Sequence, residues 1–201
     1  MCGVYGITCR DEKFIRDYIT TCSYRGPDGS GIWANDDITL GHNLLAITSQ
    51  PDHGKQPWHT NNGNVLIYNG EIFNYKELVT KYNLTLQTSC DTELLAHLLD
   101  TIGIDCVGQI DSMHAFALYN VKDQTIILSR DHAGIKPLFY AETSDGLIFG
   151  SEIKGMLDRV PNARCIDDLA AAAMSYSGLN VTRNTMFCNI KKVLPGETLV
   201  Y

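Results

Sequence analysis

Residues 1–7 read Met-Cys-Gly-Val-Tyr-Gly-Ile (MCGVYGI), which places a cysteine directly after the initiator methionine and ahead of an apolar run. The β-branched and aromatic residues at 4–7 predict a β-strand. Cys2 is then either a small residue at the start of that strand or, once Met1 is removed, an N-terminal nucleophile. The segment carries neither the basic and apolar regions of a secretion signal nor the glycine that myristoylation requires.

The composition of the 201-residue chain is that of a globular protein, with 44% apolar and 19% charged residues. The net charge of −7 and the lack of a Lys/Arg-rich run argue against nucleic-acid binding. No stretch approaches the ~20 apolar residues of a membrane span. We therefore expect one domain, residues 1–201, in the cytoplasm, with no nucleic acid and no membrane as partners.

The seven cysteines and six histidines are scattered along the chain, and no C-x-x-C pair is present. An odd number of cysteines without close pairs is typical of free thiols in a reducing compartment. The same spacing disfavours zinc, whose ligands usually come in short-spaced pairs. We expect neither a bound metal ion nor a cofactor.

Hydrophobic periodicity predicts strands grouped in hairpins, with a few helices between the groups. The expected helices cover 13–23, 75–82, 92–101, 152–157 and 167–175. The expected strands cover 4–7, 38–47, 64–68, 115–121, 125–129, 139–141 and 147–149. Because neighbouring strands are joined by short turns, the pattern predicts the α+β class with mostly antiparallel sheets rather than a βαβ series.

Three polar segments contain more charged and hydrogen-bonding residues than a turn requires. Residues 25–31 place three glycines and a proline around Arg25 and an aspartate. Asn69-Gly70, between a strand and a helix, is either a turn signal or a pair of donors, a side-chain amide and a backbone N–H, for an oxyanion hole. Asp91 begins the leucine-rich helix, and taken alone it is an N-cap.

These segments belong to a longer ordered series: MCGVYGI, YRGPDGSG, LGHNLLAI, Gln56-Pro57, YNGEIFNY, TSCDTELL, MHAFALYN, SRDHAGIKPLFYA, FGSEIKGML and IKKVLPGETLVY. In this order the chain resembles, over essentially all 201 residues, the glutaminase domain of glutamine-hydrolysing asparagine synthetases, which are class II glutamine amidotransferases. The resemblance implies the N-terminal-nucleophile hydrolase fold, a four-layer αββα sandwich of two mostly antiparallel sheets.

The resemblance also implies a mechanism. The Cys2 thiol would attack the side-chain amide of glutamine and expel ammonia, and water would hydrolyse the resulting thioester to glutamate. A cysteine thiol titrates near ~8.5 and an α-amine near ~8, so the amine of Cys2 can take the thiol proton. While Met1 is attached that nitrogen is an amide, and we therefore predict that Met1 is removed.

Site residues follow from the resemblance position by position. Asn69, through its side chain, and Gly70, through its N–H, match the family's oxyanion hole. Glu71 and Asp91 match positions near the α-ammonium of glutamine, where a carboxylate is the natural partner. Arg25, in the R-G-P-D motif, either lines the nucleophile end of the site or holds its glycine-rich loop in place.

One substrate-binding position departs from the family pattern. Leu44 stands where the family has an arginine that binds the α-carboxylate, and Ala46 replaces a serine. Three outcomes stay open: Lys55 or backbone N–H groups bind the carboxylate, the activity is weak or partner-dependent, or another amide is the substrate. Residues 130–138 (R-D-x-x-G-I-K-P-L) are interpreted as architectural.

The chain contains no G-x-x-x-x-G-K-[ST] sequence and no Ser-Gly-Gly-rich loop of the kind a synthetase domain uses for ATP. We therefore expect the ATP-pyrophosphatase synthetase domain to be absent, so that either a separate synthetase receives the ammonia or the chain is a fragment. The leading prediction is hydrolysis of glutamine to glutamate and ammonia for an asparagine synthetase-like partner. The alternatives are an N-terminal-nucleophile amidohydrolase for another amide, or a weakly active glutamine-sensing or scaffolding subunit.

Overall fold

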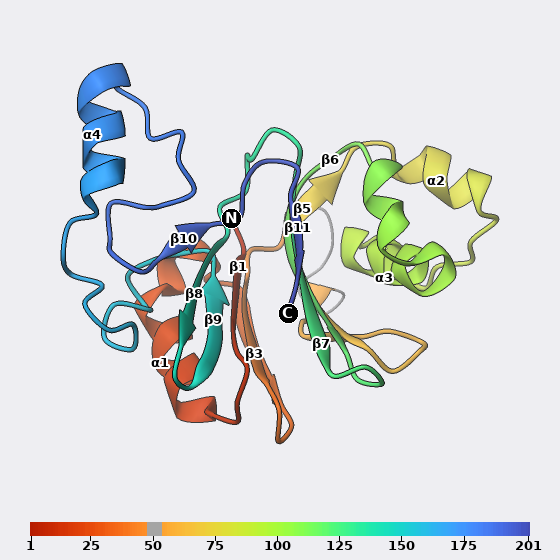
Figure 1. Ribbon diagram of the computed structural model, residues 1–201. Coiled ribbons are helices and arrows are strands. Elements are labelled where there is room, and N and C mark those ends of the chain that lie inside the picture. The colour runs from red at the N-terminus through yellow and green to blue at the C-terminus, as the bar shows by residue number, and fades with distance from the viewer. Residues whose placement is uncertain (48–53) are drawn as a thin grey trace.

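The computed structural model describes residues 1–47 and 54–201. In these residues two antiparallel β-sheets lie face to face, and helices cover their outer faces (Figure 1). The observed class is α+β, as the hairpin pattern of the sequence predicts.

The first sheet has six strands in the order β10-β8-β9-β1-β3-β2. Their bounds are β1 Gly3–Ile7, β2 Gly29–Ala34, β3 Thr39–Leu44, β8 Phe139–Thr143, β9 Gly146–Gly150 and β10 Lys191–Lys192. Strand β1 is paired on both sides, with Gly3 opposite Asn43 of β3 and Tyr5 opposite Gly150 of β9. Cys2 therefore enters the molecule at the end of a central strand, where neighbours on both sides fix its main chain.

The second sheet has five strands in the order β11-β7-β6-β5-β4. Their bounds are β4 Trp58–His59, β5 Val65–Ile72, β6 Ser112–Asn120, β7 Thr125–Arg130 and β11 Thr198–Val200. The long central pair β5–β6 carries Asn69, Gly70 and Glu71 near its end. The second sheet thus presents these three residues from a rigid strand.

Alternation of side chains along the strands builds four layers. Val4 of β1 and Val65 of β5 point into the core between the sheets, whereas Tyr5 packs on the outer side against helix α1 (Glu12–Thr21). On the other side Leu66 packs with helices α2 (Tyr75–Lys81) and α3 (Asp91–Ile102). The αββα order that the resemblance implies is confirmed.

Helix α1 illustrates how the local sequence positions a layer. Asp11 accepts a hydrogen bond from the N–H of Phe14 at 2.9 Å and so caps the helix. Ile15, Tyr18 and Ile19 recur at helical spacing and are buried against the first sheet. The expected helix over 13–23 is confirmed, with its start one residue earlier and its end at Thr21.

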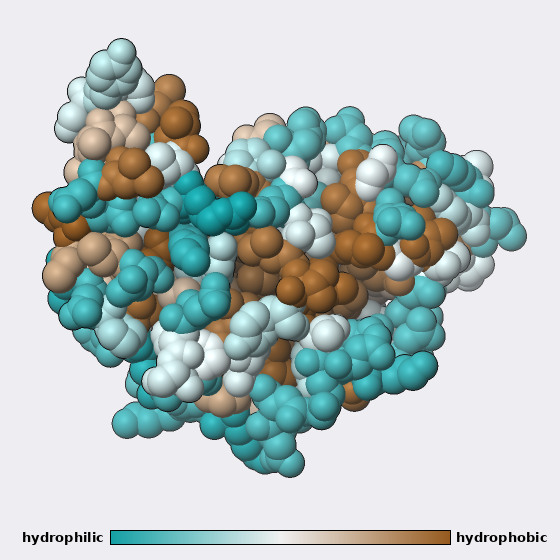
Figure 2. Space-filling view, viewed as in Figure 1, coloured by the Kyte–Doolittle hydropathy of each residue, from teal (hydrophilic) through white to brown (hydrophobic). Residues whose placement is uncertain are grey.

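Helix α4 (Asp168–Ser177) extends away from the two sheets at the upper left of Figure 1. Asp167 caps it by accepting a hydrogen bond from the N–H of Ala170 at 2.8 Å, in agreement with the expected helix over 167–175. Figure 2 shows apolar surface on this helix, where Leu169 and Met174 are exposed. None of the helices in the described ranges combines the length and the apolar character that a bilayer crossing demands.

Two sequence-based predictions of local structure are wrong. Residues 152–157 form successive turns instead of a helix, and Gly155 packs so closely on Tyr18 that a Cβ there would lie 2.0 Å from its ring. Residues 69–71 do not form a loop, because β5 continues through them to Ile72 and pairs with β6. The expected strand over 38–47 ends earlier, at Leu44.

We expect acid to destabilise the fold through His42 and His114. Burial lowers the pKa of each ring to about 4, below the ordinary histidine value of 6.5. Between pH 6.5 and about pH 4 the unfolded chain therefore binds more protons than the folded chain. The free energy of unfolding falls as the pH drops through that range. The loss is at most roughly 3 kcal/mol per ring.

Urea denaturation at about pH 7 and about pH 5 measures this loss. The double variant His42→Gln, His114→Gln should show a smaller difference between the two pH values than the unmodified chain. An equal difference in the two proteins would contradict the assignment.

Candidate active site

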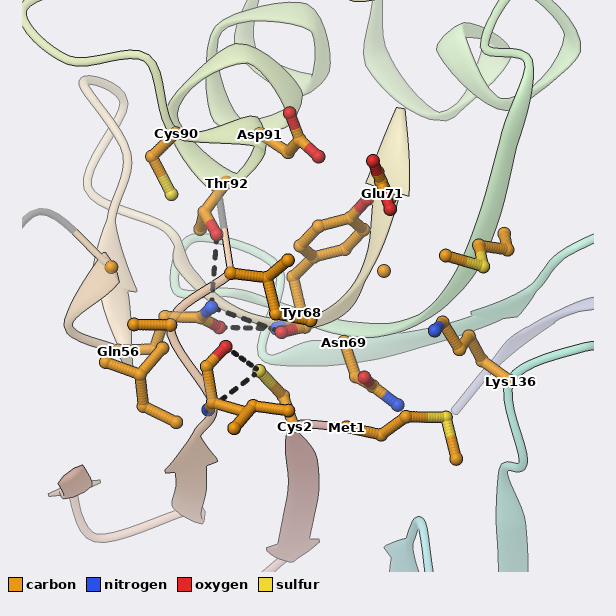
Figure 3. Close-up of a pocket in the computed structure, with 17 residues that line it drawn as sticks. Met1, Cys2, Gln56, Tyr68, Asn69, Glu71, Cys90, Asp91, Thr92 and Lys136 are labelled. Atoms are coloured by element: carbon orange, nitrogen blue, oxygen red, sulfur yellow. Dashed lines mark hydrogen bonds between the residues drawn. The ribbon is translucent and has the colours of Figure 1, made fainter. Parts of the chain in front are cut away.

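A cavity at the N-terminal end of β1 brings most of the expected site residues together (Figure 3). Six of the seven line it: Cys2, Leu44, Asn69, Gly70, Glu71 and Asp91. They come from both sheets and from the start of α3, so the two halves of the sandwich each contribute part of the site. Among the described residues, no group of three or more His, Cys, Asp or Glu side chains is arranged to hold a metal ion.

The Cys2 thiol lies against the segment that follows β3. Its Sγ accepts a hydrogen bond from the N–H of Leu45 at 3.3 Å and lies 3.6 Å from the carbonyl oxygen of the same residue. Burial raises the pKa of the thiol, and the Leu45 N–H opposes that rise. The thiol is therefore mainly protonated at neutral pH and needs a base before it can attack.

A base is available at the chain terminus. Burial lowers the pKa of the terminal amine of Met1, and the positive charge of Arg25 lowers it further. An amine with a lowered pKa is more often unprotonated at neutral pH and is thus a better proton acceptor. Removal of Met1 would place such an amine on Cys2 itself.

Asn69 offers an unused hydrogen-bond donor. The side chain is buried, and its Nδ2 has no hydrogen-bond partner among the described residues. Buried amide groups are nearly always paired, so an unpaired donor that lines a cavity is suited to a group that binds there. Figure 3 shows this amide extending into the cavity on the same side as Cys2 and Met1.

Gly70 offers a second donor, from the backbone. It lies opposite His114 of β6, but the N–H and the C=O of His114 both bond to Asp131. The pair is therefore of the non-hydrogen-bonded kind, and the Gly70 N–H points away from β6. A Cβ at this position would lie 2.5 Å from the carbonyl oxygen of Met113, so the close strand pairing requires glycine.

Glu71 and Asp91 place two carboxylates in the cavity. Asp91 does not cap its own helix; its Oδ2 accepts a hydrogen bond from the N–H of Ile72 at 3.0 Å and ties α3 to β5. Burial raises the pKa of Asp91 to about 6, and the nearby charge of Glu71 adds to the rise. A bound cation would relieve this repulsion, so this end of the cavity suits an amine.

Arg25 contacts the main chain of the nucleophile and does not line the cavity. Its Nε donates to the carbonyl oxygen of Cys2 at 2.9 Å, and its Nη1 donates to Glu152 at 2.7 Å. The guanidinium is buried. Arg25 thus holds the main chain of Cys2 in place through its bond to the carbonyl oxygen.

The wall beside Cys2 is apolar. Leu44 is 7% exposed, and Ala46 and Ile47 continue the same lining. Among the described residues that line the cavity, Lys136 has the one positively charged side chain. The Leu44 side chain therefore has neither a hydrogen-bond donor nor a positive charge with which to bind a carboxylate.

A family model described as a glutamine amidotransferase domain matches residues 1–201, the full length of the chain. The chain belongs to the glutamine amidotransferase domain family. A putative asparagine synthetase (glutamine-hydrolyzing) 2 of Methanocaldococcus jannaschii is 36% identical over 180 residues, which cover 78% of this chain and 35% of that protein. Asparagine synthetase (glutamine-hydrolyzing) 3 of Bacillus subtilis is 29% identical over 214 residues, which cover 100% of this chain and 35% of that protein. The amidotransferase chain thus spans about a third of the length of these curated relatives.

A solved structure shares the fold. Glutamine phosphoribosylpyrophosphate amidotransferase from Bacillus subtilis superimposes with a TM-score of 0.69 at 20% identity, covering 99% of this chain and 47% of that one. The likeness confirms the N-terminal-nucleophile hydrolase fold for the amidotransferase domain.

Gln56 and Lys136 also contribute to the amidotransferase site, and the sequence alone did not predict this role for either residue. Gln56 acts as a substitute strand neighbour, because its side-chain amide bonds both the N–H of Tyr68, at 2.6 Å, and its carbonyl oxygen, at 3.1 Å. The same amide also bonds Thr92 of α3. Lys136 lines the cavity from the 130–138 segment. Both lie in segments that carry the family resemblance, which was the available signal.

Proposed function

We propose that residues 1–201 form one glutaminase domain that hydrolyses glutamine to glutamate and ammonia through a thioester on Cys2. The observation that carries the proposal is the unpartnered amide of Asn69 in the cavity that also holds the Cys2 thiol. A donor held in this way is suited to the oxyanion that forms when a thiolate attacks an amide.

The reaction proceeds in two halves after Met1 has left. The amine of Cys2 takes the thiol proton, and Sγ attacks the side-chain amide carbon, so that negative charge develops on the amide oxygen beside Asn69 and Gly70. The ammonium returns the proton to the leaving nitrogen, and ammonia departs. Water then attacks the thioester through the same oxyanion site, and the release of glutamate restores the thiol.

The substrate is oriented by its α-ammonium. Glu71 and Asp91 lie in one cavity with the nucleophile, and both carboxylates gain from a cation. Glutamine carries its ammonium a fixed number of bonds from the amide carbon, so two anchor points determine its orientation.

We also propose that the ammonia is transferred to an ATP-dependent synthetase, as a separate subunit or domain, in an asparagine synthetase-like reaction. Support comes from the relatives, which are named as glutamine-hydrolysing asparagine synthetases and are about three times as long.

We propose a cytoplasmic location for the domain. The seven cysteines are all free, which is typical of a reducing compartment.

Release of glutamate from glutamine by the purified protein tests the proposal. We expect turnover with glutamine and much less with asparagine, whose side chain is one methylene shorter and would hold the amide carbon farther from Cys2 when the α-ammonium is bound by the carboxylates. Turnover of an unrelated amide in place of glutamine would favour the amidohydrolase alternative, which the apolar wall at Leu44 also suits.

Leu44→Arg is expected to lower the KM for glutamine by about tenfold or more. A carboxylate bound without a partner is costly, and a guanidinium placed at this wall would supply one. Steady-state kinetics measure KM and kcat for the two proteins. Leu44→Met, which adds no charge, is the matched control; an Arg variant with unchanged KM and turnover would contradict the role assigned to this wall.

A further inference from the structure

Lys136 is a buried cation for which the proposed chemistry has no role so far. Its side chain is 6% exposed and lines the cavity together with Cys2 and Asn69. Its Nζ makes no hydrogen bond or ion pair with any residue that the structure describes. Burial of a charged lysine side chain costs free energy, and a negative charge within the cavity would stabilise its ammonium.

The surrounding loop holds the backbone of Lys136 rigidly. Its N–H donates to Asp131 Oδ2 at 2.9 Å, and its carbonyl oxygen accepts from Arg130 Nε at 2.7 Å. Arg130 also binds the carbonyl oxygens of Gly134 and Val193, and Asp131 is fully buried. The 130–138 segment is therefore architectural, as the sequence suggests, and one product of that architecture is a fixed position for Lys136.

Lys136 lines the same cavity as Cys2, and in Figure 3 Asn69 lies between its side chain and the Cys2 thiol. In Figure 3 its ammonium is directed toward the region between Asn69 and Glu71, beside Met1. Burial lowers the pKa of Lys136, while Cys2, when it is a thiolate, and the carboxylate of Glu71 raise it. In turn, Lys136 is among the groups that lower the pKa of Cys2.

We propose that Lys136 is a positioning residue of the glutamine reaction, which supplies the positive charge that favours the thiolate of Cys2 and the negative charge that develops beside Asn69. The proposal rests on the proposed function for its place in catalysis. Its effect on the thiol is a property of the free protein and needs no substrate.

Other charged or titratable groups also surround Cys2, and the expected effect of Lys136 has to be separable from theirs. They are the terminal amine, Arg25 at the end of η1 (Ser23–Arg25), Tyr68 and Glu71 from β5, and Cys90 and Asp91 at the start of α3. The carboxylates disfavour a thiolate, and Arg25 is held by Glu152. Lys136 is thus the cationic side chain in the cavity that is available to a thiolate.

The pH dependence of Cys2 alkylation by iodoacetamide, read by peptide mass spectrometry, tests the proposal. In Lys136→Met we expect the midpoint to rise by about one pH unit, the lower end for an opposite charge at close range. Lys136→Arg, which keeps the charge, should stay within a few tenths of a unit. Lys122→Met, in the exposed turn after β6, is the control for the loss of one positive charge elsewhere.

An unchanged midpoint in Lys136→Met would overturn the proposal, even if its KM for glutamine rose, since that pattern assigns Lys136 to the substrate carboxylate. Lys136→Gln serves as a second variant if the methionine protein fails to fold. Because alkylation is measured without glutamine, this result and a failure of glutamine hydrolysis can be told apart.

Discussion

Cys2→Ala is expected to reduce glutamate release from glutamine by a factor of about 10⁵ or more. The covalent route needs a thiolate at the end of β1, and no other thiol shares the position fixed by Leu45 and Arg25. In other hydrolases, loss of the nucleophile alone lowers kcat about as much as loss of all the catalytic residues together, by about 10⁵-fold or more. A coupled glutamate assay measures the effect.

Cys165→Ala is the matched control, because Cys165 is exposed and lies near α4, away from the cavity. It should retain the activity of the unmodified protein. If Cys2→Ala instead kept turnover within tenfold, the reaction would not pass through a thioester at this residue, and another group in the cavity would have to be the nucleophile.

Asn69→Ala is expected to lower kcat by about 10²–10³, the cost of one lost oxyanion-hole donor. Nδ2 has no partner within the described ranges 1–47 and 54–201, so the substitution removes no hydrogen bond that the structure shows. The interaction forms mainly in the transition state, and kcat and kcat/KM should therefore fall together while KM changes little. Steady-state kinetics separate these quantities.

Asn69→Asp is the isosteric partner of this variant. It keeps the volume of the side chain but replaces a donor by an acceptor, so it should be at least as slow as the alanine variant. If Asp at this position were fully active, Asn69 would serve only to fill space, and the Gly70 N–H would be the one remaining oxyanion donor.

The strands that the sequence predicts well are those with strongly apolar residues. In β1 and β6 such residues follow one another, and both strands lie in the centre of their sheets. Strand β2 begins Gly-Ser-Gly and gives no such signal; it forms because β3 pairs with it along its whole length. The two-residue strands β4 and β10 depend in the same way on their partners.

The site residues divide in the same way, into those that the local sequence predicts and those that long-range contacts place. Cys2, Asn69 and Asp91 could be predicted because each stands in a segment with a recognisable order of residues. The extension of β5 through Gly70 could not, because the Asn-Gly pair reads locally as a turn and only the pairing with β6 overrides it. The place of Lys136 is likewise set by long-range contacts, through Arg130 and Asp131.

Intact mass spectrometry of the protein, quenched with acid during turnover of glutamine, examines the role of Cys2 most directly. We expect a chain that begins at Cys2 and carries one γ-glutamyl group, which hydroxylamine removes as it does other thioesters. Full activity from a chain that still carries Met1, with no adduct on Cys2, would contradict an N-terminal cysteine nucleophile.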